Sequence, residues 1–112
     1  MAVTAATVFV PERWVEQTGT AYLLQVKGDC MTGAGIRNGD LIGVRPQSAA
    51  NDGDIVVALV SGCRVLKTFR RHGGHDWLVP ESQDHEPVLA DGVTILGVVS
   101  GHIRWLGQRG EG

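Results

Sequence analysis

The sequence predicts an all-β domain built from short, mostly antiparallel strands. Three observations favour this class. Short apolar stretches recur along the chain, turns rich in glycine and aspartate separate them, and almost no segment has the periodicity of an amphipathic helix. The chain has 112 residues, of which 43% are hydrophobic and 20% charged, as in ordinary globular proteins. This length suits one domain with a modest core, so we expect residues 1–112 to form a single domain.

The N-terminal part should hold only short elements before the first long strand. Residues 1–7 are small and featureless, which predicts a frayed terminus. A short strand at 8–10, stopped by Pro11, should lead into one helical turn at 12–17 and a turn at 18–20. The apolar, β-prone segment 22–26 is the first long strand, and the glycine-rich segment 31–38 should form a loop or a short helix.

The remaining strands are predicted from apolar runs between turn residues. Residues 54–60 form the most apolar of these runs, which predicts a central strand. The two-residue link Ser61-Gly62 is typical of a hairpin and should pair this strand with 63–70. The other predicted strands are 41–45, 76–79, 93–100 and 102–106, with polar connections at 46–51, 72–75 and 80–87. Residues 88–90 precede a predicted turn at 91–92, and residues 108–112 should form a polar tail.

The predicted strand at 63–70 places a lysine on an apolar face. Every second side chain of a strand shares a face. One face then carries Cys63, Val65, Lys67 and Phe69. We expect the other face, which carries the arginines, to be exposed to solvent. A lysine on an apolar face either extends its ammonium to the edge or is kept out of water for a purpose. Because desolvation disfavours the ammonium, a buried lysine can act as a base near neutral pH.

Four sequence blocks follow one another in a fixed order. They are Gly28-Asp29-Cys30-Met31, Gly35-Ile36-Arg37-Asn38-Gly39-Asp40, Asn51-Asp52-Gly53-Asp54-Ile55-Val56-Val57-Ala58 and Val65-Leu66-Lys67. Together they resemble the C-terminal self-cleavage peptidase domain of the LexA repressor and UmuD family, over residues 8–106. The resemblance implies a LexA/signal-peptidase-like β-ribbon fold of short, strongly bent strands.

The resemblance also implies a Ser/Lys dyad. In that family a serine of the first block is the nucleophile, and a lysine further along the chain is the general base. The resemblance gives Cys30 the nucleophile position and Lys67, 37 positions later, the role of general base. Gly28, Asp29 and Met31 would shape the oxyanion site, where each N–H donor is worth roughly 3–4 kcal/mol. The resemblance implies no metal ion and no cofactor.

Three features depart from the family's pattern. Cysteine replaces serine at position 30, and a thiolate beside Lys67 would favour the ammonium over the neutral base, so we expect weak or no amide cleavage. Val65 stands where many relatives have threonine, and valine cannot donate a hydrogen bond near the dyad. No suitable bond between a small residue and glycine precedes Cys30. The chain therefore resembles a processed fragment that lacks the N-terminal helix-turn-helix of the repressors.

By resemblance, the chain is the autoproteolytic and dimerisation domain of a transcription repressor of the SOS response to DNA damage. A RecA–single-stranded DNA filament would then act as co-activator of cleavage. Two alternatives stay open: a processed UmuD-like accessory fragment of a translesion polymerase, and a non-catalytic dimerisation module of a phage-type repressor. A signal peptidase shares the dyad but should carry a membrane anchor. We expect a homodimer formed through residues 93–106, because an unpaired apolar strand edge there would invite pairing.

Composition and charge argue against several other classes. The net charge of −2 gives no electrostatic footprint for nucleic acid, so we expect no direct DNA binding. The cluster Arg70-Arg71-His72 is interpreted as a solvated turn. No apolar run approaches the roughly 20 residues that span a bilayer, and the start lacks a secretory signal, so we expect no membrane association and a cytoplasmic protein. The two cysteines make no disulfide framework, and the four histidines lack metal-ligand spacing.

Overall fold

The structure is a computed structural model that describes residues 2–5, 10, 12–28, 31–82 and 86–104. The elements in chain order are β1 (Ala2–Ala5), α1 (Glu12–Thr18), β2 (Tyr22–Lys27), η1 (Thr32–Ala34), β3 (Leu41–Pro46), β4 (Ile55–Val60), β5 (Cys63–His72), β6 (His75–Val79), β7 (Val88–Leu89) and β8 (Thr94–Ile103). The strands pair antiparallel throughout the part of the chain that is described. The predicted all-β class is confirmed.

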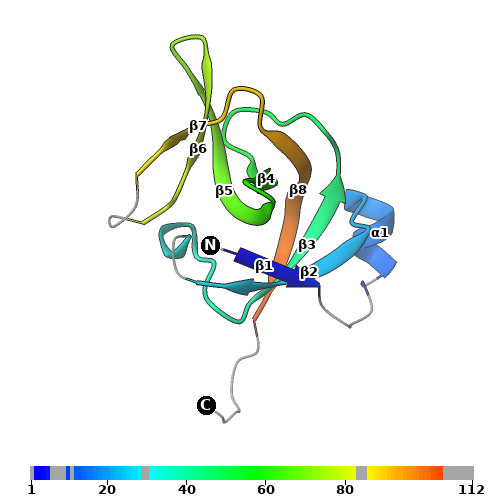
Figure 1. The fold of residues 1–112 in the computed structure, drawn as a ribbon. Coiled ribbons are helices and arrows are strands. Elements are labelled where there is room, and N and C mark those ends of the chain that lie inside the picture. Colours follow the sequence, from blue (N-terminus) through cyan, green and yellow to red (C-terminus); the bar gives the residue numbers. More distant parts are fainter. Residues whose placement is uncertain (1, 6–9, 11, 29–30, 83–85, 105–112) are drawn as a thin grey trace.

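The strands form one sheet that closes on itself over most of its width. Their order is β1-β2-β3-β8-β4-β5-β6-β7, and β1 also pairs with β5. This extra pairing joins the first six strands of that order into a ring, while β6 and β7 continue beyond it as an extension of β5 (Figure 1). In Figure 1 the β5–β6 hairpin rises away from the ring, so the molecule has a closed body and a projecting ribbon.

Two core clusters lie against this sheet. The first cluster gathers buried side chains of the ring and of the turn around η1: Val3, Leu24, Val26, Met31, Ile36, Ile42, Val44, Val57 and Leu66. The second cluster lies toward the projecting ribbon and contains Ala50, Val56, Ala58, Phe69, Leu78, Ala90, Ile95 and Val98. Strands β4 and β5 contribute to both clusters, so both of their faces are covered. This is why β4 is so uniformly apolar, and the prediction that it is central is confirmed, since it pairs with β8 on one side and β5 on the other.

The prediction of a frayed N-terminus is wrong. Residues 2–5 form β1, which pairs along its whole length with β2, with Val3 opposite Val26. Val3 is only 5% exposed and belongs to the first core cluster. The sequence hid this strand because its other residues are alanine and threonine, whose small side chains give no periodic apolar signal. The predicted strand at 8–10 falls mostly outside the described residues, and residue 10 is not in a strand.

The helix at the start of the chain is slightly longer than predicted. It runs over seven residues, Glu12–Thr18, instead of the single turn at 12–17. Its Trp14 ring lies on Gly43 of β3 and Gly101 of β8, and the lack of a side chain at Gly43 leaves room for it. A Cβ at Gly43 would approach the ring to 2.8 Å. One aromatic residue therefore docks α1 on the outside of two neighbouring strands.

The last two predicted strands form one continuous strand. β8 pairs with β3 and β4, and its register shifts once against each of them, opposite Gly43/Val44 and opposite Val57/Ala58. Such β-bulges bend a strand sharply, which interrupts the apolar alternation that the prediction used. Among the described strands, β4 pairs only with the first half of β8, up to Val98, whereas residues 99–103 pair with β3 alone. Residues 105 and 106, part of the predicted contact, lie outside the described residues.

The other predicted elements agree with the structure. β2, β3, β5 and β6 match the predicted strands to within two residues, and η1 is the short helix expected in the glycine-rich loop. Ser61 and Gly62, at φ of 50° and 80°, form the tight link of the β4–β5 hairpin. The structure contains no helix, within the residues it describes, that is long and apolar enough to cross a membrane.

Candidate active site

Lys67 lies in the middle of β5, opposite Val56 of β4. Its side chain is half-buried, and its two chain neighbours Leu66 and Thr68 are buried, at 0% and 3% exposure. The prediction of a wet face opposite Lys67 is therefore wrong at this point of the strand. Only the outer residues of that face, such as Arg64, are exposed, because the first core cluster covers its centre.

Gly28 follows β2 and lies two residues before the nucleophile position. Gly28 has φ of 109°, in the region that favours glycine, and its N–H donates to Oδ1 of Asn38 at 3.0 Å. This N–H, predicted to help an oxyanion, is thus engaged within the loop. Asp29 and Cys30, two of the predicted site residues, lie outside the described residues.

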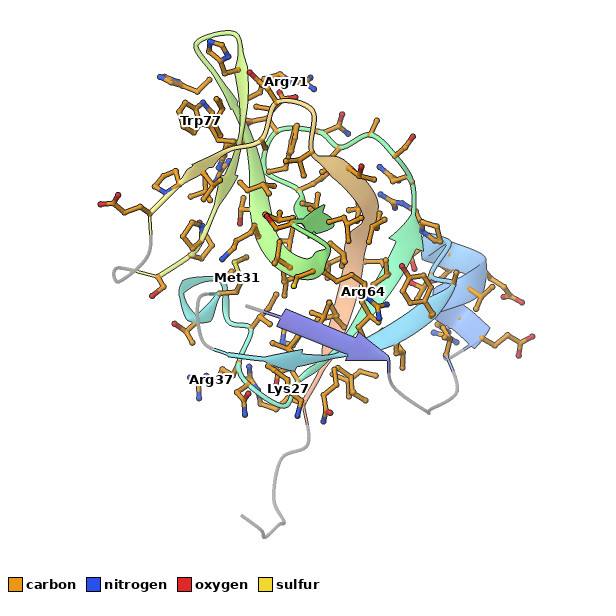
Figure 2. All side chains as sticks on the ribbon, viewed as in Figure 1. Lys27, Met31, Arg37, Arg64, Arg71 and Trp77 are labelled. Carbon is orange, nitrogen blue, oxygen red and sulfur yellow. The ribbon has the colours of Figure 1, made fainter. Side chains whose placement is uncertain are left out.

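Met31, the residue after the nucleophile position, is fully buried. Its carbonyl accepts hydrogen bonds from the N–H groups of Ala34 and Ile36, at 3.0 and 3.2 Å, and so closes the turn that contains η1. Figure 2 shows the Met31 side chain extending from this turn toward β5. There Met31 belongs to the same core cluster as Leu66. The residues next to positions 30 and 67 are therefore held in one packed cluster.

The turn at η1 is also attached to the segment just after β6. The N–H of Gly33 donates to the carbonyl of Glu81 at 2.7 Å. A Cβ on Gly33 would lie 2.6 Å from that carbonyl oxygen, closer than real Cβ atoms come. The sequence did not single out Gly33, because the need for glycine comes from a partner 48 positions away.

An ion pair that sequence reasoning missed lies at the base of this turn. Nε and Nη2 of Arg104 donate to the two carboxylate oxygens of Asp40 at 2.9 and 2.7 Å. Burial of the Asp40 carboxyl by itself would raise its pKa. The hydrogen bonds from Arg104 and from the N–H of Arg37, with the charges of Arg104 and His102, outweigh burial and hold that pKa below its ordinary value of 3.8. The hydrogen bond to Asp40 likewise raises the pKa of Arg104. Asp40 precedes β3 and Arg104 follows β8, and the two residues become neighbours only because these strands pair antiparallel, so no local sequence signal pointed to the pair.

β1 approaches the candidate site at its N-terminal end. Ala2 pairs with Val65 of β5 in antiparallel orientation. Going backward along β1 therefore corresponds to going forward along β5, from Val65 toward Lys67. The start of β1 thus points along β5 in the direction of the candidate base.

Nothing in the described residues suggests a metal centre. Within the described ranges, no group of three or more histidine, cysteine, aspartate or glutamate side chains could hold a metal ion. His75 contacts Asp91 at 2.8 Å, and Cys63 is an exposed free thiol at the start of β5.

Comparisons with known proteins identify the family. The Peptidase S24-like family model matches residues 2–100. The chain is 49% identical over 88 residues to the LexA repressor of Acidothermus cellulolyticus, covering 79% of this chain and 32% of that protein. It is 43% identical over 97 residues to the LexA repressor of Pseudarthrobacter chlorophenolicus, with coverage of 87% and 39%. It is 41% identical over 101 residues to the LexA repressor of Mycobacterium leprae, with coverage of 90% and 43%. The chain thus spans less than half the length of these relatives. It belongs to the Peptidase S24-like family and resembles the LexA repressors within it.

Proposed function

We propose that this chain is the single-domain, C-terminal self-cleavage and dimerisation part of a LexA-like SOS-response repressor. Cys30 occupies the position of the nucleophile and Lys67 that of the general base. The family and the LexA relatives support this assignment. The observation that carries it is the shared packing of Met31 and Leu66, which anchors the backbone beside both positions in one core cluster.

The segment to be cleaved would come from the chain upstream of β1. Because β1 runs antiparallel to β5 and meets it at Val65, any chain that precedes residue 1 in a longer protein would be led along β5 toward Lys67. A bond between a small residue and glycine in that upstream segment is the substrate we propose, and a RecA–single-stranded DNA filament is the proposed co-activator. The cleavage reaction would need no metal and no cofactor.

The cysteine at position 30 should make amide cleavage slow. A thiolate beside Lys67 stabilises the ammonium, so Lys67 is no longer a neutral base for the reaction. The larger sulfur must also fit a site built for oxygen. This feature favours a second candidate function, a non-catalytic dimerisation module or an UmuD-like accessory fragment in which the dyad has lost its chemistry.

Dimerisation is proposed through the second half of β8. Residues 99–103 pair with β3 alone among the described strands, and a second copy would pair with the edge that those strands leave unpaired. A homodimer should appear in sedimentation at tens of micromolar, and a monomer at that concentration would contradict this part of the proposal. The net charge of −2 supports our view that this domain does not itself read DNA.

The dyad is tested by the pH–rate profile of iodoacetamide alkylation at each cysteine, read by mass spectrometry. Thiolate is the species that alkylates, and a nearby ammonium stabilises it. Cys30 should therefore label faster than the exposed Cys63, and Lys67→Ala should slow Cys30 alone. The matched control is Arg64→Ala, which removes a positive charge from an exposed position on the same strand. Equal rates at the two cysteines, or an unchanged profile in Lys67→Ala, would show that the two residues are not a coupled pair.

Cleavage is tested in the longer parent protein carrying Cys30→Ser. The hydroxyl fits the family's geometry, so self-cleavage at alkaline pH should become faster than in the Cys30 protein. Adding Lys67→Ala should abolish the gain. A Cys30→Ser protein that stays intact at alkaline pH and with RecA filaments would favour the non-catalytic alternative.

A further inference from the structure

Arg104 lies directly after β8 and reaches across to the turn that precedes β3. Besides its two hydrogen bonds to Asp40, its Nη2 donates to the carbonyl of Gly35 at 2.5 Å. The Asp40 side chain is 3% exposed and that of Arg104 is 33% exposed. Charge-assisted bonds in a forked geometry are both strong and directional, and a lysine cannot reproduce them.

The two groups that Arg104 holds lie at the end of the η1 turn and just before β3, in the segment 31–40 that follows the nucleophile position. Gly35 ends η1 in a left-handed conformation, with φ of 83°. Its N–H donates to the carbonyl of Thr32 at 3.0 Å, which fixes the turn that Met31 begins. At the end of the segment, Oδ2 of Asp40 accepts a hydrogen bond from the N–H of Arg37 at 2.9 Å. One side chain from the end of β8 therefore holds the segment 31–40 at its middle, at Gly35, and at its last residue, Asp40.

We propose that Arg104 is a positioning residue for the reaction: by holding the segment 31–40, it fixes the backbone that follows the nucleophile position and so supports the action of Lys67 on Cys30. This inference rests on the proposed function of Cys30 and Lys67. Arg104 does not touch the reacting atoms. It acts through Asp40, Gly35 and the η1 turn, whose first residue is Met31, the neighbour of the nucleophile.

The other attachments of this segment do not replace Arg104. The contact of Gly33 with Glu81 and that of Gly28 with Asn38 are hydrogen bonds between neutral groups. They leave the charge of the buried Asp40 carboxylate uncompensated. A buried carboxylate without its cation is strongly unfavourable, so the turn should rearrange when Arg104 is removed, even though these two contacts remain possible.

The first experiment measures amide hydrogen exchange in Arg104→Ala. Protection should fall at Ala34, Ile36 and Arg37, whose N–H groups are bonded within the segment. Protection in β4 and the first half of β5 should stay unchanged, which shows that the variant is folded. Arg71→Ala is the matched control, because Arg71 also forms an ion pair with an aspartate at 2.9 Å, but on the projecting hairpin. It should leave the exchange of the segment 31–40 unchanged.

The second experiment measures the alkylation rate of Cys30 in Arg104→Ala, Lys67→Ala and the double variant. Arg104→Ala should slow Cys30 at pH 7 at least about threefold, since alkylation follows the thiolate fraction. The double variant should be no slower than Lys67→Ala alone, because the two residues act on the same group. Arg104→Lys should give an intermediate alkylation rate of Cys30, since lysine keeps the positive charge but cannot donate two hydrogen bonds to the carboxylate in the geometry of the guanidinium group.

The outcomes separate this inference from the proposed function. An unchanged Cys30 rate in Arg104→Ala overturns the inference, with or without loss of protection, since a merely structural role would change exchange only. Additive effects in the double variant also overturn it. The dyad itself is judged by Lys67→Ala alone. If Arg104→Ala does not fold, Arg104→Lys decides instead, and a Cys30 rate in that variant equal to that of the unsubstituted protein overturns the inference.

Discussion

Two aspartates in turns of this molecule have the same chemistry and different surroundings. Asp40 precedes β3 and pairs with Arg104, with 3% of its side chain exposed. Asp91 precedes β8 and, at 46% exposure, contacts His75. We call Arg71, His75, Asp76 and Asp91 the hairpin cluster. Figure 2 shows Arg71 on the projecting hairpin, and Arg37, beside Asp40, at the other end of the molecule.

Both carboxylates have a lowered pKa, but for different reasons. For Asp40, burial opposes the shift and the bonds from Arg104 and the Arg37 N–H overcome it. For Asp91, the N–H of Asp76 is the main cause, followed by the hydrogen bond with His75. The same direction of shift therefore means different things. At Asp40 the charge has lost its water and depends on its partner, whereas at Asp91 solvent can replace any partner that is removed.

The largest expected effect is that of Asp40→Ala. The change removes two hydrogen bonds to Arg104 and one to the Arg37 N–H, and leaves the guanidinium without its partner. Because Arg104 remains one-third exposed, we expect the free energy of unfolding to fall by about 3 kcal/mol, at the low end for a broken buried pair. Urea denaturation at pH 7 measures this loss. Asp91→Ala, the matched change in the hairpin cluster, should cost clearly less. Equal losses would contradict the contrast between the two turns.

A somewhat smaller effect is expected from Gly33→Ala. The added Cβ would lie 2.6 Å from the carbonyl oxygen of Glu81, a backbone atom that cannot simply rotate away. Such overpacking should lower the free energy of unfolding by roughly 1–3 kcal/mol. Gly101→Ala is the control, since its Cβ would meet only the edge of the Trp14 ring, at 3.4 Å. If thermal denaturation shows Gly101→Ala to be less stable than Gly33→Ala, the close approach of Gly33 to the Glu81 carbonyl does not explain the loss of stability.

The acid limb of the stability curve should distinguish Asp40→Asn from the unsubstituted protein. The pKa of Asp40 in the folded protein lies below the ordinary value of 3.8. Between these two pKa values the unfolded chain therefore binds more protons than the folded protein does. The contribution of Asp40 is therefore present above about pH 4–5 and is lost as the pH falls through the folded pKa. Arg104 and His102 supply the positive charges around Asp40, and the side chain of Arg104 and the backbone N–H of Arg37 donate hydrogen bonds to it. Denaturation at pH 7, 5, 4 and 3 should show the difference between the two proteins shrinking toward acid. A constant difference would contradict the assignment.

The smallest expected effect is that of Arg71→Ala in the hairpin cluster. Arg71 is 60% exposed, pairs with Asp76 at 2.9 Å and lies over the Phe69 ring at 5.4 Å. Exposed ion pairs and exposed cation–π contacts are each worth about 0–1 kcal/mol, and salt screens the ion pair. The free energy of unfolding should therefore fall by less than about 1 kcal/mol. A loss as large as that of Asp40→Ala would show that the hairpin cluster is more important to the fold than its exposure indicates.

The sequence by itself determined the class of fold, most of the strands and the family. Apolar runs of five or six residues, the Ser61-Gly62 link and the four ordered blocks are local signals, and local signals can be detected without knowing which strands become neighbours. Cys30 and Lys67 were identified in the same way, from their blocks and spacing. Their roles stay a proposal, because Cys30 lies outside the described residues.

Only the tertiary structure decided the features that depend on partners distant in sequence. β1 has no periodic pattern of its own and is a strand because β2 and β5 pair with it. Leu66 is buried because the first core cluster covers a face of β5 that the alternation of side chains alone predicted to be exposed to solvent. Gly33 meets Glu81, and Asp40 meets Arg104, only after the ring has closed. A short stretch of sequence reports the propensities of its own residues, whereas burial and ion pairing are set by whatever the rest of the chain places against them.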